Sequence, residues 1–175
     1  MKKVLVLLLT ASSVAAFADD TSSSAGGNNL YVGVGAGAGW NNAASPATSF
    51  RLDGGYNFNE YFAVELGATG ITQAGGAINQ GSTFYDASVK GTLPLSDMFA
   101  LVGQLGGAYA NPGVATGNGL TIGNGQAGWD FLTAAGVQMN LTRQVSLNLM
   151  DYYYYGAPNP DGNTNVVLAG IKYNF

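Results

Sequence analysis

The chain offers few side chains that could do chemistry. Its 175 residues include no histidine and no cysteine, which removes the commonest general base, the commonest metal ligand and all thiol sites. Gly123 to Gly128 fits the G-x-G-x-x-G pattern of a dinucleotide loop, but that pattern works only before a helix, and a strand pattern follows here. The loop Asn159 to Asn163 lacks the spaced carboxylates of a calcium loop. We therefore expect no catalytic residue, no metal site and no cofactor.

The composition is unusual for a water-soluble domain. Charged residues make up 9% of the chain and hydrophobic residues 47%, with 27 glycines, whereas soluble domains have about 25% charged residues. Disordered chains are poor in apolar residues, so disorder does not explain the low charge. Six Lys and Arg residues against ten Asp and Glu give no basic surface, and we expect no nucleic-acid partner.

The N-terminus has the pattern of a secretion signal. Lys2 and Lys3 precede a mostly apolar run over residues 4–10, and Ala16 to Ala18 form a small-x-small cleavage motif. The run is much shorter than the ~20 residues of a membrane-spanning helix. We predict a cleaved signal peptide over residues 1–18, a flexible segment over residues 19–29 and a β-barrel over residues 30–175.

Beyond residue 29 the hydrophobic pattern alternates with the period of two that is typical of strands. In Leu30 to Trp40, for example, Val32 and Val34 share one face and glycines occupy most of the other. Gly, Asn, Asp or Pro interrupts every apolar stretch, so we expect no transmembrane helix. Eight such segments are predicted: residues 30–40, 49–58, 61–69, 84–93, 98–109, 129–140, 145–155 and 164–175.

The connections alternate between short turns and long polar loops. Each segment has about the 9–11 residues that cross a bilayer when tilted, and a sheet in lipid must close because no backbone group can stay unpaired. Short turns on one side and long loops on the other are typical of outer-membrane barrels, with the turns in the periplasm. The predicted external loops are Asn41 to Thr48, Gly70 to Thr83, Asn111 to Gly128 and Gly156 to Asn163.

The two faces of the predicted strands differ in a way that indicates lipid outside. One face holds large apolar residues, and the other holds mostly Gly, Ala, Ser, Thr and Asn with single charges. A soluble eight-stranded ligand-binding barrel, the alternative, would need a charged exterior that 9% charged residues cannot supply. We predict an all-β fold, an eight-stranded antiparallel up-and-down transmembrane β-barrel. Val34, Leu66, Leu105 and Ile171 should then face outward.

Aromatic residues gather near the ends of the predicted strands, as the interfacial girdles of membrane barrels do. We also assign the run Tyr152 to Tyr155 to a girdle in preference to a stacking platform. Asp151 falls on the lipid-facing side, and we predict a bulge that turns it inward. The residues predicted to form the girdles are Trp40, Phe58, Phe62, Phe99, Tyr109, Trp129, Tyr153 and Tyr155.

Several short motifs occur in the order found in one family of barrels. They are Gly55-Tyr56 and Glu65-Leu66-Gly67, Lys90 to Pro94 with Gln104 to Gly107, Gly136 to Gln138, and Gly170 to Phe175. In these the chain resembles the transmembrane domain of the outer membrane protein A family. The resemblance implies an integral outer-membrane protein in contact with outer-membrane lipids and lipopolysaccharide. Ile171, Tyr173 and Phe175 resemble the signal that the barrel-assembly machinery reads.

The family holds a charged network inside the barrel, and Glu65 and Lys90 look like matches to two of its positions. Gln104, Gln138 and Asn148 stand where other members often carry charges. The predicted lumen network comprises Arg51, Asp53, Glu65, Asp86, Lys90, Gln104, Gln138, Asn148 and Lys172. It could gate a small pore or form a structural plug. We favour the plug because side chains nearly fill an eight-stranded barrel.

Three functions remain open. The first is a structural or surface-interaction role with a largely plugged lumen. The second is a small pore for ions or small solutes, which the interior glycines Gly33, Gly35, Gly37, Gly39, Gly67, Gly106 and Gly136 would favour by leaving room for water. The third is an adhesin that binds an external ligand or host surface through its loops. An enzyme is not expected, because outer-membrane barrel enzymes generally use a histidine and this chain has none.

Overall fold

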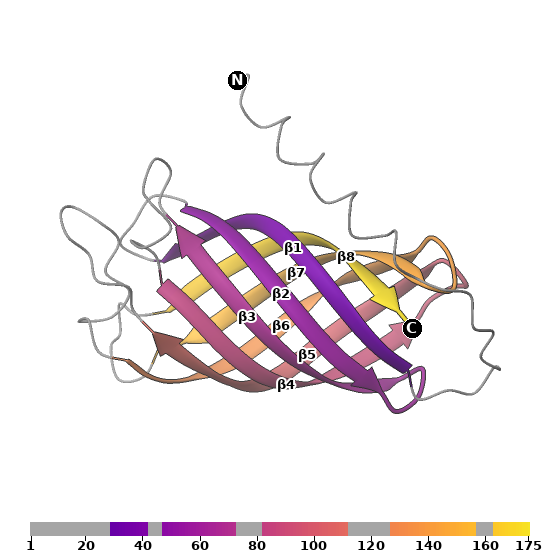
Figure 1. Cartoon of the computed structure of the whole chain (residues 1–175), viewed down its shortest axis with the longest axis horizontal. Coiled ribbons are helices and arrows are strands. Elements are labelled where there is room, and N and C mark those ends of the chain that lie inside the picture. The colour runs from indigo at the N-terminus through magenta and orange to yellow at the C-terminus, as the bar shows by residue number, and fades with distance from the viewer. Residues whose placement is uncertain (1–28, 42–46, 73–81, 112–126, 157–162) are drawn as a thin grey trace, which may run out of the picture.

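The computed structural model describes residues 29–41, 47–72, 82–111, 127–156 and 163–175. Eight antiparallel strands form a closed barrel in sequence order (Figure 1), which confirms the predicted fold. The ends of the strands agree with the predicted segments to within three residues. The strands are β1 (Asn29–Asn41), β2 (Ala47–Asn57), β3 (Phe62–Thr72), β4 (Ser82–Pro94), β5 (Phe99–Asn111), β6 (Gly128–Asn140), β7 (Val145–Tyr155) and β8 (Thr164–Asn174).

Several predictions fall on residues outside these ranges. The predicted signal peptide, residues 19–28 and most of the four long loops are not among the described residues. Asn29, expected in the flexible segment, is the first residue of β1. The glycine motif that ends at Gly128 leads directly into strand β6. No helix in the described part of the chain is long and apolar enough to cross a membrane.

The barrel closes through the pairing of β1 with β8. Following paired residues from Leu30 once around the eight strands leads back to β1 at Trp40, ten residues further along. Such a stagger requires strands tilted by about 35–45° to the barrel axis, and the tilt is visible in Figure 1. Closure leaves the sheet without an unpaired edge, as a spanning sheet requires.

The outward face of the barrel is apolar. Val34, Leu66, Leu105 and Ile171 are 40%, 68%, 60% and 41% exposed. Charged residues of the barrel strands, such as Arg51 and Glu65, are buried inside. The polarity is therefore inverted relative to a soluble barrel, and the alternative of a soluble ligand-binding barrel is wrong.

Asp151 is an exception on this outward face, and the predicted bulge is wrong. Strand β7 pairs without interruption, with Asp151 opposite Ala135 on β6 and Val167 on β8. Its side chain is exposed. Of the outward-facing positions described in the eight strands, this one alone holds an Asp, Glu, Lys or Arg.

The three short turns contain the same type of hydrogen bond between a side chain and the backbone. The second residue of each four-residue turn accepts a backbone N–H through its side chain: Asn59 from Phe62 at 2.8 Å, Ser96 from Phe99 at 3.1 Å and Thr142 from Val145 at 2.9 Å. Such side chains replace a backbone partner in a tight turn. They fix the ends of β3, β5 and β7, and with them the register that places the interior residues.

Candidate functional site

The interior of the barrel holds a cluster of charged residues, supplied by alternate positions on four strands. Arg51 and Asp53 come from β2, Glu65 from β3, Asp86 and Lys90 from β4, and Lys172 from β8. The register explains part of the convergence, because Gly67 on β3 lies opposite both Asp53 and Asp86. Two carboxylates thus flank a position that has no side chain.

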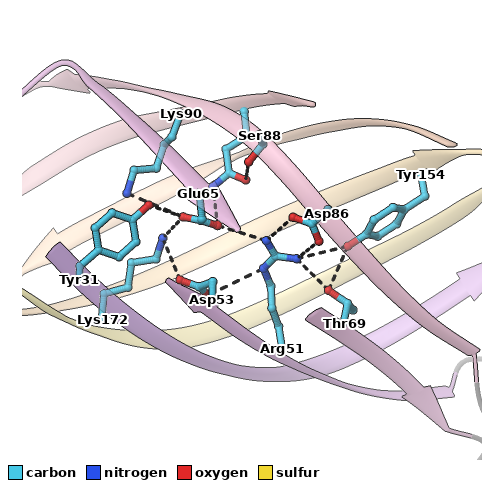
Figure 2. A network of polar contacts seen from close by, with 11 residues as sticks. Tyr31, Arg51, Asp53, Glu65, Thr69, Asp86, Ser88, Lys90, Tyr154 and Lys172 are labelled. Atoms are coloured by element: carbon cyan, nitrogen blue, oxygen red, sulfur yellow. Dashed lines mark hydrogen bonds and ion pairs between the residues drawn. The ribbon is translucent and has the colours of Figure 1, made fainter. Parts of the chain in front are cut away.

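Arg51 occupies that space at the centre of the cluster (Figure 2). Its Nη1 and Nη2 atoms donate to the two carboxylate oxygens of Asp86 at 2.6 and 2.8 Å, a bidentate arrangement. Nη2 also donates to Glu65 at 3.2 Å, and Nη1 to the Thr69 hydroxyl at 2.9 Å. The guanidinium lies 4.4 Å from the centre of the Tyr152 ring.

Glu65 is the second centre. Its carboxylate accepts hydrogen bonds from the Tyr31 hydroxyl and from Lys172 Nζ, both at 2.7 Å, and from the Gln104 amide at 3.1 Å. Lys90 Nζ lies farther away, 3.8 Å from Glu65 and 3.9 Å from the centre of the Tyr31 ring. Five inward-facing side chains therefore converge on Glu65 when Arg51 is included.

The cluster is electrically balanced. Three cations, Arg51, Lys90 and Lys172, face three carboxylates, Asp53, Glu65 and Asp86, and every carboxylate lies within 4.0 Å of at least one cation. Buried charges are tolerated when they are paired and hydrogen-bonded. Side-chain contacts alone link strands β1, β2, β3, β4, β5 and β8 across the lumen.

The prediction that interior glycines leave room for water is wrong at six of the seven positions, because a Cβ would lie within 3.0 Å of another atom at Gly33, Gly37, Gly39, Gly67, Gly106 and Gly136. A Cβ on Gly67 would overlap the guanidinium of Arg51, and a Cβ on Gly33 would overlap the carboxylate of Asp53. These glycines make space for charged side chains from neighbouring strands. Gly55 does the same for the ring of Tyr31.

An apolar cluster that the sequence analysis missed lies in the lumen toward the long loops, beside the buried hydroxyl residues Ser49, Ser82 and Thr164. Phe84, Leu132, Tyr154 and Val166 are fully buried and belong to one cluster. The rings of Phe84 and Tyr154 stack with their centres 4.3 Å apart. The girdle interpretation is therefore wrong for Tyr152 and Tyr154, which point inward. Tyr152 and Tyr154 are an even number of positions from Ser146 and Asn148 on the same strand, so all four side chains lie on one face. This spacing is the sequence signal that indicates the inward orientation of the two tyrosines.

The remaining predicted lumen residues divide into two groups. Gln104 is buried in the network. Gln138 and Asn148 are half-buried near the turns, where Gln138 donates to Asn140 at 2.8 Å. Among the described residues, neither Gln138 nor Asn148 hydrogen-bonds a charged side chain.

The predicted girdle residues lie on the outside, near the strand ends. Trp40, Phe58, Phe62, Phe99, Tyr109, Trp129 and Tyr155 are exposed, and Tyr153 is half-buried. In the predicted signal for the barrel-assembly machinery, Ile171 and Phe175 are exposed. The rings of Tyr173 and Phe175 meet edge to face, with their centres 5.2 Å apart.

Two further observations concern titration and metals. Tyr61, in the first short turn, donates a hydrogen bond to Glu60, and this bond together with the negative charge of Glu60 raises the pKa of the phenol. Within the described residues, no group of three His, Cys, Asp or Glu side chains is placed to hold a metal ion.

The sequence matches the family described as "Outer membrane protein beta-barrel domain" over residues 4–175. The chain belongs to this family. Its members are proteins of the outer membrane, and this barrel is therefore an outer-membrane protein. A comparison with curated protein sequences gives no significant match.

Solved structures share the fold of this outer-membrane barrel at low sequence identity. The N-terminal barrel of OprF from Pseudomonas aeruginosa is 12% identical, with 83% of this chain and 97% of that chain covered and a TM-score of 0.62. Neisserial surface protein A is 15% identical (84% and 96% covered, TM-score 0.58). Ail, the attachment invasion locus protein of Yersinia pestis, is 14% identical (85% and 97% covered, TM-score 0.55). Ail has also been solved with the heparin analogue sucrose octasulfate.

Proposed function

We propose that this outer-membrane barrel does not conduct ions, because its own side chains close the lumen. We also propose that the protein acts through its external loops. The observation that supports this most directly is the succession of two layers inside the barrel. The Arg51 cluster bridges the strands at mid-length, and the stacked pair Phe84 and Tyr154 lies beyond it toward the loops.

Both layers oppose ion passage. The charged layer is held by short hydrogen bonds between Arg51, Asp86 and Glu65, so an ion would have to break buried ion pairs to pass. The rings of Phe84 and Tyr154 replace little of the water shell of an ion, because the Tyr154 hydroxyl is already hydrogen-bonded with Thr69 at 3.0 Å. A small pore, the alternative, would require both layers to open.

Conductance in planar lipid bilayers tests this proposal. We expect no current steps from the wild-type barrel. The triple variant Arg51→Ala, Phe84→Ala and Tyr154→Ala removes both layers and should produce current steps. Such steps would also show that the barrel inserts into the bilayer under the conditions of the assay. Folding of each protein is checked by its change in gel mobility on boiling. Current steps from the wild-type protein would contradict the closed lumen and favour the pore.

Surface interaction is the active part of the proposal, and the similarity to the fold of Ail supports it. The composition of the loops limits the class of ligand that they could bind. The four predicted loops contain no Lys or Arg, and Asp161 is their single charged residue. A sulfated polyanion of the kind bound to Ail needs positive charge, so we propose that an external ligand here is not polyanionic.

Cell-surface binding assays test this role. Replacing residues 113–126 by a Gly-Ser linker of equal length should abolish binding of cells to host surfaces without changing assembly. Heparin should neither bind nor compete. Unchanged binding after the replacement would reject the adhesin and leave a structural role.

We further propose that the outward aromatic residues sit at the two membrane interfaces against lipid and lipopolysaccharide. Phe175, Tyr173 and Ile171 are proposed as the signal for the barrel-assembly machinery. Catalysis is not proposed, since the chain has no histidine or cysteine to act as base or nucleophile.

A further inference from the structure

A groove lies on the lipid-facing side of the barrel, across strands β3 to β6. Its volume is about 810 Å³, and Gly91, Gly103 and Ala135 lie in it side by side, each paired directly with the next. Larger apolar residues stand two positions away from this row on either side. On β4 and β5 they are Leu93 and Leu101 toward the turns and Val89 and Leu105 toward the loops. The small residues therefore form the floor of a trough.

The two glycines of this floor are not required by packing inside the barrel. A Cβ on Gly103 would meet only a backbone oxygen at 4.0 Å, and a Cβ on Gly91 only a backbone oxygen at 3.9 Å. At Gly33 and Gly67, by contrast, charged side chains from a neighbouring strand occupy that space. Glycine weakens the interior of a strand, and it often marks a place where a ligand approaches the backbone closely. The paired glycines therefore indicate a close contact on the lipid side.

The row of small residues leads to Asp151, which lies directly opposite Ala135 on the outer face. Asp151 is exposed, and none of the ion pairs among the described residues includes it. Every Lys and Arg of the described strands is buried in the lumen, and Arg143 belongs to the third turn. The barrel wall thus supplies no charge to balance this carboxylate.

The row rises from the turn side toward the loop side. Gly91 lies three residues from the turn end of its strand, Gly103 four, Ala135 five and Asp151 six. Because strands are about 4.8 Å apart, the row from Gly91 to Asp151 is about 14 Å long. Asp151 also lies two residues below Tyr153, one of the outward aromatic residues near the loops. The trough therefore runs inward from the outer interface, as a lipid tail does.

We propose that the groove and Asp151 bind an acyl lipid whose linkage region carries hydrogen-bond donors, as the amide N–H of an amide-linked lipid does. The acyl chain lies along Gly91 and Gly103, and the linkage donates to the carboxylate. Ester linkages have no donor at this level, and a headgroup ammonium lies nearer the water. A donor that meets a carboxylate forms a strong, charge-assisted hydrogen bond. A lipid-facing charge without such a partner is unfavourable, so the site selects lipids that bring one.

Sphingomyelin and phosphatidylcholine with matched acyl chains are the probes. They share the phosphocholine headgroup, but sphingomyelin carries an amide N–H and a hydroxyl where phosphatidylcholine has esters. The barrel is reconstituted into nanodiscs that contain equal amounts of both lipids, and the lipids that stay bound are counted by native mass spectrometry. Sphingomyelin should be retained roughly threefold to tenfold more than phosphatidylcholine, the effect of one hydrogen bond.

Three variants separate the carboxylate from the groove. Asp151→Leu should remove the preference, so that both lipids are retained equally. Gly103→Leu fills the floor of the trough and should lower the retention of sphingomyelin. Gly107→Leu is the matched control, because Gly107 faces lipid on the same strand outside the groove, and a Cβ there meets only a backbone oxygen at 4.0 Å. This control should behave as the wild type. The change in gel mobility on boiling checks that each variant is folded.

The possible results are decisive for each part of the site. Equal retention of the two lipids by the wild-type barrel would overturn the proposal. A preference that persists in folded Asp151→Leu would show that the carboxylate is not the acceptor, and equal retention by Gly103→Leu and Gly107→Leu would reject the groove. Phosphatidylethanolamine is added as a third lipid to test the headgroup. If it is retained above sphingomyelin, Asp151 binds an ammonium and the linkage donor is rejected.

Discussion

Replacing Arg51 by methionine should destabilise the barrel more than any change on its surface. The arginine forms two hydrogen bonds with Asp86 and one with Glu65 in a setting where its side chain is 1% exposed. Without it, three buried carboxylates face two lysines, and no described cation other than Arg51 lies within 4.0 Å of Asp86. Leaving one partner of a buried ion pair uncompensated costs about 3–5 kcal/mol.

The free energy of unfolding can be measured by urea titration of the barrel in lipid vesicles. Trp40 and Trp129 are exposed on the outer face near the loops, so their fluorescence reports the loss of lipid contact. We expect Arg51→Met to lower the free energy of unfolding by about 3–5 kcal/mol. The double variant Arg51→Met with Asp86→Leu removes both charges and should recover at least half of that loss.

A matched control and a clear refutation are available. Arg143 is an exposed arginine in the third turn, and Arg143→Met should change the stability by less than about 0.5 kcal/mol. A loss of only about 1 kcal/mol for Arg51→Met would show that water solvates the cluster as it does a surface ion pair. A double variant as unstable as the single one would refute the assignment of the loss to an orphaned Asp86.

Three further predictions concern other parts of the barrel. Gly67→Ala places a Cβ against the Arg51 guanidinium and should lower the free energy of unfolding by about 1–3 kcal/mol, whereas Gly70→Ala on the same strand meets nothing within 4 Å and should be neutral; equal effects would contradict the close contact. Asp151→Leu should raise the stability in bilayers by about 1 kcal/mol, since a charge on the lipid face is unfavourable, and a loss in the same urea titration would mean that Asp151 has a partner. Glu60→Gln should lower the pKa of Tyr61 toward its ordinary value, because the raised pKa comes from the hydrogen bond and charge of Glu60; an unchanged NMR titration of Tyr61 would oppose this cause.

The fold could be predicted from the sequence because the side-chain period of a strand is two. Alternation assigns a face to each residue without any knowledge of neighbours in space, and it correctly places Leu66 outside and Glu65 inside. The turn residues Asn59, Ser96 and Thr142 mark the hairpins by local chemistry alone. These signals act over a few residues, so a single sequence contains them.

The pairing inside the lumen could not be read in the same way. Parity places Arg51, Asp86 and Glu65 inside, but which carboxylate receives the guanidinium depends on the stagger between strands. Glycines at Gly67 and Gly33 looked like empty space, whereas the structure uses them to admit side chains from β2. Contacts between strands far apart in sequence follow from the register, and alternation along one strand does not specify it.

The prediction at Asp151 is wrong because it considers the unfavourable exposure of one residue and not the contacts that the rest of the strand makes. A bulge ahead of Asp151 would turn this carboxylate inward, but it would also move Tyr152 and Tyr154 to the outside, because a shift of one residue exchanges the two faces. Tyr154 would lose its stacking on Phe84 and its hydrogen bond with Thr69 at 3.0 Å, and Arg51 would lose the ring of Tyr152. A lipid-facing Asp costs less than a Lys or Arg at the same depth, and those three contacts together outweigh it. The uninterrupted register of β7 is therefore set by the two tyrosines in the lumen, and Asp151 is the residue left exposed by their placement.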